Sequence, residues 1–356
     1  MKQGTFGTLQ QLAAELDRQN NAKHDFIADT AHMKMITEDK ISRLEVIDRA
    51  ATMNRLDSYQ VNSHAMNQVG VWAGIPSGYM ERLRSHPGLL DENVNHWLHV
   101  NHQPRMLRTM DGQARAFLSN SYKRIDNYPV MELTLKALQG KDITVQSCDV
   151  TENRMYLKVV SPKLETEIKK GDVVQFGFVL KNSEIGLGAF ELQQFMYTLA
   201  CLNGMIIPKD MSEGIRRTHL GARQGAGILY RDDTILAGNR AFVLQVRDTI
   251  EAMMSEEAVK QTVQRLQDLT TRQITGDVVK GIEVLGKTLG FSQDEGSGIL
   301  RHLINGGDLS QYGVLNAVTR YAQDAPTYDR ASELELMGGK IIDLHPRQWQ
   351  QVAEAA

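Results

Sequence analysis

The chain has 356 residues, of which 42% are apolar and 23% charged, and its formal net charge is −3. This length and composition predict a folded protein of two or three packed parts and exclude wholesale disorder. The net charge excludes a globally basic coat protein for nucleic acid, but it leaves room for a local basic groove.

The sequence carries no mark of export or of membrane insertion. Residues 1–16 lack the basic-then-apolar order of a signal peptide. No apolar run approaches the roughly 20 residues of a membrane span. Two cysteines, Cys148 and Cys201, are too few for a disulfide framework and favour a reducing compartment. We therefore expect a cytoplasmic protein without a membrane partner.

Apolar residues of the first hundred positions recur at helical spacing. Leu9, Leu12 and Leu16 predict a first helix. Thr37, followed by two acidic residues, predicts the start of a second helix that extends to about Met53. Three further helices are expected over residues 63–74, 77–85 and 91–102. Residues 1–102 are thus predicted to form an N-terminal helical region.

The spacing changes from helical to alternating near Arg105. Residues 105–110 and 113–122 flank Asp111-Gly112, a dipeptide suited to a two-residue hairpin turn. Asn127 then begins a helix that runs to about residue 138. Four strands are expected next, over residues 143–151, 154–160, 173–181 and 189–199. The third strand should be buried on the face that carries Val174, Phe176, Phe178 and Leu180.

Helical spacing returns after a glycine-rich passage over residues 214–238. Residues 240–272 form a long amphipathic stretch. Shorter helices are expected over residues 278–289, 296–304, 315–322 and 331–342. The predicted fold class is α+β, with a central antiparallel sheet and a packed helix over residues 103–238. Helical regions at 1–102 and 239–356 are expected to flank this central domain.

Four segments form a recognisable series: His64–Leu98, Arg115–Asn127, Lys181–Ala189 and Leu199–Ile206. A basic passage with a histidine and a glycine, residues 216–221, follows them. The series resembles the phage/plasmid-like family of unknown function over roughly residues 62–223. The resemblance implies no established activity. It implies a mobile-element context in the host cytoplasm, where DNA replication, recombination and host defence are common tasks.

Two basic clusters are the strongest physical indication of function. Residues 214–231 contain no Asp or Glu, and their interleaved glycines allow backbone amides to approach a phosphate. The predicted hairpin carries the second cluster, which only Asp111 opposes. Phosphates supply affinity for such a basic track, and any base can stack on an aromatic ring. The residues expected to contact nucleic acid are Arg216, Arg217, His219 and Arg223, followed by Lys123, Arg124, Arg105 and the stacking platform Tyr122.

These residues also have other interpretations. Lys and Arg protect exposed sheet edges, so the hairpin cluster also fits a solvated edge. A catalytic alternative makes Cys201 a nucleophile, His219 its base and Glu184 or Asn203 the orienting group. The apolar run around Cys201 favours instead a buried, inert thiol.

No cofactor or metal is expected from the motifs. The helical triplet His96, His99 and His102 can place two imidazoles on one face, but no further ligand accompanies them. The sequence has no phosphate-binding loop of the Gly-x-x-x-x-Gly-Lys-Ser/Thr type and no compact acidic cluster. These absences disfavour an ATP-driven motor and a two-metal nuclease.

The sequence therefore predicts an ATP-independent, non-enzymatic nucleic-acid-binding protein of a phage or mobile element. We expect it to bind or anneal single-stranded DNA in recombination or replication. The apolar positions of the helical tail fit either packing within the chain or a subunit contact, so a homo-oligomer is also predicted. Two alternatives stay open: a metal-dependent enzyme that processes nucleic acid, and a protein-directed inhibitor of a host defence system.

Overall fold

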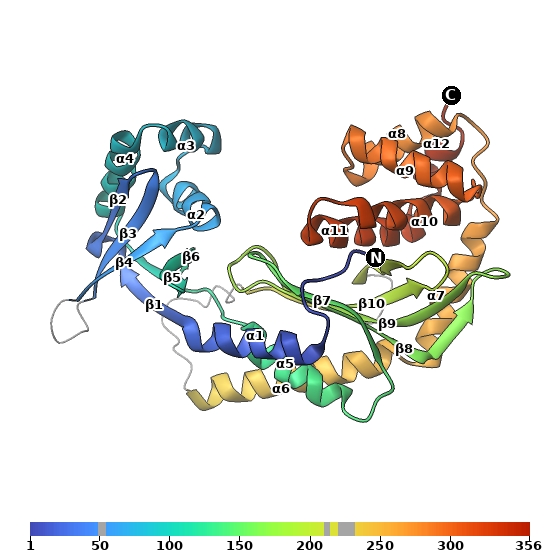
Figure 1. The fold of residues 1–356 in the computed structure, drawn as a ribbon, viewed down its shortest axis with the longest axis horizontal. Coiled ribbons are helices and arrows are strands. Elements are labelled where there is room, and N and C mark those ends of the chain that lie inside the picture. Colours follow the sequence, from blue (N-terminus) through green and yellow to red (C-terminus); the bar gives the residue numbers. More distant parts are fainter. Residues whose placement is uncertain (49–54, 210–213, 220–231) are drawn as a thin grey trace.

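The computed structural model describes residues 1–48, 55–209, 214–219 and 232–356. The chain is an α+β protein, as predicted, with two separate sheets. Figure 1 shows the first sheet with helices α2–α4 apart from the second sheet, which carries the C-terminal helices. None of the helices within the described ranges combines the length and the apolarity required to span a bilayer.

The first sheet contains four strands from the beginning of the chain and the two strands of the predicted hairpin. Its order is β1-β5-β6-β4-β3-β2, and only the β4–β6 pair is parallel. The helices α2 to α4 and the sheet share one core, which includes Met66, Val94 and Phe117. The strands are β1 (Lys23–Asp29), β2 (Met33–Glu38), β3 (Ile41–Asp48), β4 (Arg55–Val61), β5 (Pro104–Met110) and β6 (Gln113–Ser119). The helices are η1 (Thr30–His32), α2 (Ser63–Ala73), α3 (Ser77–Arg84) and α4 (Pro87–Val100).

The helix predicted to begin at Thr37 is wrong, because β2 and β3 form a hairpin there. Asp39 and Lys40 have φ angles of 50° and 66°, and two consecutive positive φ angles fit a two-residue hairpin turn. Leu44 and Val46 are buried at alternate positions, which is the period of a strand. The predicted N-terminal helical region therefore contains four strands besides its helices, and residues 104–119 complete the same sheet.

Helix α4 protects the outer edge of this sheet. The carboxamide of Asn95 accepts a hydrogen bond from Met35 N at 2.6 Å and donates one to Met35 O at 2.9 Å. One helical turn before Asn95, Asp91 accepts a hydrogen bond from Thr37 N at 2.7 Å. One turn after it, His99 Nε2 lies 3.1 Å from Met33 O. Side chains four residues apart on a helix thus take the place of a neighbouring strand.

The second sheet is antiparallel, in the order β11-β10-β9-β8-β7, and a short strand β12 also pairs with β10. The face of β9 predicted to be buried is completely buried at Val174, Phe176, Phe178 and Leu180. The strands are β7 (Thr144–Val150), β8 (Met155–Glu167), β9 (Val173–Asn182), β10 (Phe190–Thr198), β11 (Asn203–Ile206) and β12 (Ile215–Arg217).

Helices cover the second sheet from two directions. Helices α1, α5 and α6 share a core with it that contains Leu12, Met131 and Ile250, and the C-terminal helices share another around Phe176 and Tyr312. The amphipathic stretch over 240–272 is two helices, because Ser255 caps a new one by accepting a hydrogen bond from Ala258 N. The helices are α1 (Leu9–Ala22), α5 (Asn127–Leu138), α6 (Asp232–Met253), α7 (Glu256–Thr270), α8 (Val278–Leu289), α9 (Gln293–Gly306), α10 (Gln311–Tyr321), η3 (Ala322–Asp324), α11 (Tyr328–Lys340), η4 (Ile341–Asp343) and α12 (Pro346–Ala353).

Candidate functional site

The predicted hairpin lies in the interior of the first sheet. Asp111 and Gly112 form its turn with φ angles of 52° and 75°, as the dipeptide predicts. Strand β5 pairs with β1 and β6, and β6 pairs with β4, so neither strand of the hairpin is an edge. The interpretation of its cations as protection of a solvated edge is therefore wrong.

The two basic clusters meet at the end of this hairpin. Lys123 N donates to His219 O at 2.6 Å, and His219 Nδ1 lies 3.2 Å from Lys123 O although the residues are 96 positions apart. The ring of Tyr122 stacks on the imidazole of His219, with centroids 5.2 Å apart and planes 7° apart. Residues 122–123 after β6 and His219 after β12 therefore lie side by side.

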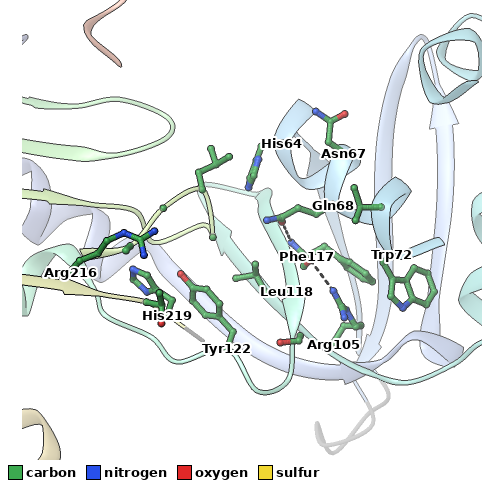
Figure 2. A pocket seen from close by; sticks show the side chains of 17 residues that line it. His64, Asn67, Gln68, Trp72, Arg105, Phe117, Leu118, Tyr122, Arg216 and His219 are labelled. Carbon is green, nitrogen blue, oxygen red and sulfur yellow. Dashed lines mark hydrogen bonds between the residues drawn. The ribbon is translucent and has the colours of Figure 1, made fainter. Parts of the chain in front are cut away.

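A cleft of about 810 Å³ opens beside this junction (Figure 2). Helix α2 and the β5–β6 hairpin form one wall, and the loop after β9 and strand β12 form the other. None of the described residues that line it is Asp or Glu. The lining residues that can bind or stack are His64, Gln68, Trp72, Arg105, Phe117, Tyr122, Arg216, Thr218 and His219.

Two arginines face the cleft from opposite walls. The guanidinium of Arg105 lies 4.8 Å from the centre of the Phe117 ring and donates to Phe117 O at 3.3 Å. Its Nε has no hydrogen-bond partner among the described residues, and burial lowers its pKa. Arg216 has a 55% exposed side chain, and its Nε lies 3.2 Å from Glu191 Oε1. Both guanidinium groups keep N–H groups that can meet an anion.

Helix α2 supplies an aromatic side chain that sequence reasoning missed. Trp72 is half-buried and meets the Phe117 ring edge-on, at 5.4 Å and 62°. Its neighbour Val71 is 81% exposed. Two bulky apolar residues that reach water at the end of a helix are the sequence signal that could have identified this wall. On the same helix, His64 Nε2 and Gln68 Nε2 both lie 2.8 Å from Ile185 O.

The loop after β9 holds the two sheets together beside the cleft. Gly186 has a φ of 82°, and a Cβ there would lie 2.7 Å from Leu118 Cδ2, so only glycine fits. Burial alone would raise the pKa of Glu184, but Lys23, Arg108 and Arg115 overcome that effect and lower it to about 2.

Two arginines of the hairpin cluster help to hold the loop after β9 against the first sheet. Arg115 lies 3.2 Å from Glu184 Oε2. Arg108 is completely buried and lies 2.6 Å from Asp25 and 2.5 Å from Asp126. These arginines stabilise the junction and are not free to contact a ligand.

The structure places the other predicted residues differently. Tyr122 is 8% exposed, and its hydroxyl donates to Ser183 O at 3.3 Å, so it is not the exposed stacking platform that we expected. Arg217 lies 4.3 Å from the centre of the Phe242 ring. Lys123 and Arg124 are exposed next to the junction. Arg223 lies outside the described residues.

The catalytic alternative is not assembled. Cys201 is exposed, so the expectation of a buried thiol is wrong. It lines a different cleft, of about 620 Å³, together with His302 and Arg320, and this cleft shares no lining residue with the one that contains His219. Within the described ranges, no three His, Cys, Asp or Glu side chains are grouped so that they could hold a metal ion.

Comparison of the chain with protein-family models, with curated proteins and with solved structures finds no match. The resemblance to a phage/plasmid-like family therefore stays a prediction from the sequence.

Proposed function

We propose that the protein binds single-stranded DNA in the cleft between the two sheets. The observation that carries this proposal is the composition of the lining, in which arginines and aromatic rings occur together and the described residues include no carboxylate. A nucleic-acid strand needs both features, because its phosphates seek cations and its unpaired bases seek flat apolar surfaces.

The geometry favours a single strand over a duplex. The volume of about 810 Å³ lies within the roughly 300–1,000 Å³ of clefts that enclose small ligands, so we expect it to hold a few unstacked nucleotides. Trp72 can stack only on a base whose face is free. In a duplex the base faces are covered by their neighbours, and only the phosphates would reach the arginines.

The cations extend beyond the cleft and give the strand a path. Arg216 lies on the wall formed by β12, while Lys123 and Arg124 are exposed where the segments after β6 and β12 meet. This binding needs no ATP. We propose that it serves recombination or replication of a mobile element, which is the context that the sequence resemblance implies.

Fluorescence anisotropy of labelled strands at several salt concentrations tests the proposal. We expect single-stranded DNA to bind more tightly than duplex DNA, and an RNA strand tests the preference for DNA. Arg216→Ala should weaken binding of all sequences alike and reduce the dependence of log K on log salt by about 0.7. Light scattering with and without DNA tests the predicted homo-oligomer.

The matched control is Arg265→Ala, because Arg265 is an exposed arginine on α7, away from the cleft. Its variant should bind like the unchanged protein. Equal losses in both variants would show that any surface arginine contributes, and the cleft would lose its assignment. Absence of binding to every strand at low salt would refute the proposal.

A further inference from the structure

His219 lines the cleft, and one nitrogen of its buried imidazole has no hydrogen-bond partner among the described residues. The residue is only 4% exposed. Its Nδ1 lies 3.2 Å from Lys123 O, and a carbonyl oxygen can only accept, so Nδ1 carries the proton of the neutral ring. Its Nε2 then bears the lone pair, and this atom has no hydrogen-bond partner among the described residues. Buried polar atoms without a partner are rare in folded proteins and call for an explanation.

The surroundings of Nε2 indicate which ligand would complete it. Figure 2 shows the ring beside Tyr122 on the Arg216 side of the cleft, and Thr218 lines the same wall. Tyr122 covers one face of the ring, so base stacking there is blocked. An arginine, a threonine and a histidine on one wall are groups that donate to phosphate oxygens.

A phosphate can use Nε2 only after a change of protonation. Both the neutral Nε2 and the phosphate oxygens are acceptors, so no hydrogen bond forms between them. A proton taken from solvent converts Nε2 into a charged N–H donor, which then bonds to a phosphate oxygen. Apart from this N–H bond, whose proton comes from the buffer, no covalent bond is made or broken. The net reaction converts protein, strand and one proton into a complex that carries the additional proton.

We infer that the His219 end of the cleft is a phosphate subsite, in which Arg216 and the doubly protonated imidazole hold one phosphate of the bound strand, so that binding takes up a proton. The inference rests on the proposed function and adds the residue that recognises the phosphate.

Burial favours the neutral ring until the phosphate arrives, because burial is the main cause that lowers the pKa of His219. The hydrogen bond to Lys123 O raises this pKa, and Arg108 lowers it. Asp126 and Glu184 oppose this effect, but they are already paired with Arg108, Lys23 and Arg115. The described charged or titratable groups that face the ring or line its cleft are Tyr122, Lys123, Arg108, Asp126, Glu184, Arg216, Arg217, Arg105 and His64. The bound phosphate places an unpaired negative charge next to the ring, and this charge raises the pKa of His219.

The first experiment measures the affinity for a single-stranded oligonucleotide by anisotropy between pH 5 and pH 8 at constant salt. If the phosphate raises the pKa of His219 by one unit, binding becomes about tenfold stronger at pH values below both pKa values than above them. His219→Gln keeps an N–H donor that does not titrate, and we expect its affinity to vary little with pH. His96→Gln, which changes an exposed imidazole on α4 outside the cleft, should keep the dependence.

His64→Gln separates the two histidines of the cleft. Burial also lowers the pKa of His64, but its Nε2 already faces Ile185 O. The inference predicts that this variant keeps the pH dependence. It is overturned if His64→Gln removes the dependence, or if His219→Gln retains it.

Calorimetric titration of the unchanged protein in two buffers of different ionisation enthalpy counts the protons directly. We expect net uptake of up to one proton per bound strand near pH 7. Binding without proton uptake would overturn the phosphate subsite and leave the proposed function intact. Absence of binding at every pH would refute both.

Discussion

Two neighbouring groups of cations differ in how they are used. The first group is Lys23, Arg108 and Arg115, which we call the buried cluster, and each of its members pairs with Glu184, Asp25 or Asp126. The second group is Arg105, Arg216 and His219, which we call the cleft cluster. Both adjoin the loop after β9. The buried cluster comes from β1, β5 and β6, and the cleft cluster comes from β5, β12 and the residues that follow β12.

The partner of a cation, and not its residue type, therefore indicates whether the cation stabilises the fold or can bind a ligand. A buried cation without a carboxylate costs several kcal/mol, so the buried cluster is held together by its pairs. Of the cleft cluster, only Arg216 has a described carboxylate partner. The arginine side chain of that pair is 55% exposed, so solvent screens the interaction. The unused donors of Arg105 and Arg216 are available for an anion from outside, and His219 becomes a donor once its Nε2 is protonated.

The largest expected effect comes from breaking the buried cluster. Glu184→Gln leaves the charges of Lys23 and Arg115 buried without their carboxylate. We expect the free energy of unfolding to fall by about 3–5 kcal/mol, because an uncompensated buried charge is strongly destabilising. Urea unfolding monitored by circular dichroism measures this loss.

The matched control is Glu132→Gln on α5, where the carboxylate pairs with Lys136 at 2.7 Å but is 53% exposed. Surface changes of this kind stay within about 0.5 kcal/mol. If both variants lose the same amount, Glu184 has no special role and the two clusters do not differ as described.

Acid should weaken the same cluster in the unchanged protein. The pKa of Glu184 is about 2 in the folded state against 4.5 as its ordinary value. The unfolded chain therefore binds a proton first as the pH falls, and the stabilisation present above pH 4.5 is lost towards pH 2. The shift corresponds to about 3 kcal/mol.

Unfolding free energies at pH 5, 4 and 3 test this expectation. Other carboxylates also titrate in this window, so the quantity to compare is the difference between the unchanged protein and Glu184→Gln. We expect the variant to show a shallower decline. Parallel curves would mean that Glu184 titrates alike in both states.

A smaller effect is expected from a change in the aromatic wall of the cleft. Trp72→Ala should weaken the binding of single-stranded DNA by about 1–3 kcal/mol, which is the usual contribution of one stacked base. Trp72→Phe keeps an aromatic face and should recover much of the affinity. Thermal unfolding of both variants controls for damage to the core, because Trp72 also contacts Phe117.

Tryptophan fluorescence provides an independent readout of that contact. The chain has two other tryptophans, and neither lines the cleft: Trp97 is half-buried on α4, and Trp349 on α12 is only 7% exposed. We expect DNA to quench part of the emission of the unchanged protein, and Trp72→Phe to lose most of this quenching. Undiminished quenching in the variant would contradict stacking on Trp72.

Much of the fold could be predicted because its signals are local. Asp111-Gly112 marks a hairpin turn, Asn127 begins a helix, and the alternation of Val174, Phe176 and Phe178 marks a buried strand. The β2–β3 hairpin could not be predicted in this way. Its turn uses Asp39 and Lys40 at positive φ, which lysine adopts rarely, so the local pattern indicated a helix instead.

The candidate site could be predicted in part for the same reason. Sequence reasoning identified Arg105, Arg216 and His219, because runs of cations with few or no carboxylates are visible in the chain. It missed Trp72, because this residue lines a cleft only when the loop after β9 and strand β12 lie opposite helix α2. It also assigned Tyr122 to stacking on bases, whereas the folded chain stacks that ring on His219.

Local patterns in the sequence were sufficient to predict the fold class, the position of most helices, strands β5 to β10, and the two acid-poor basic segments. Which cations are neutralised and which remain for a ligand depends instead on contacts between residues that are distant in the chain. Arg108 and Asp25 are 83 residues apart in the chain but in contact in the fold, and Lys123 and His219 are separated by 96. Electrostatic interactions depend on distance in space and on burial, and both quantities exist only once the two sheets have come together.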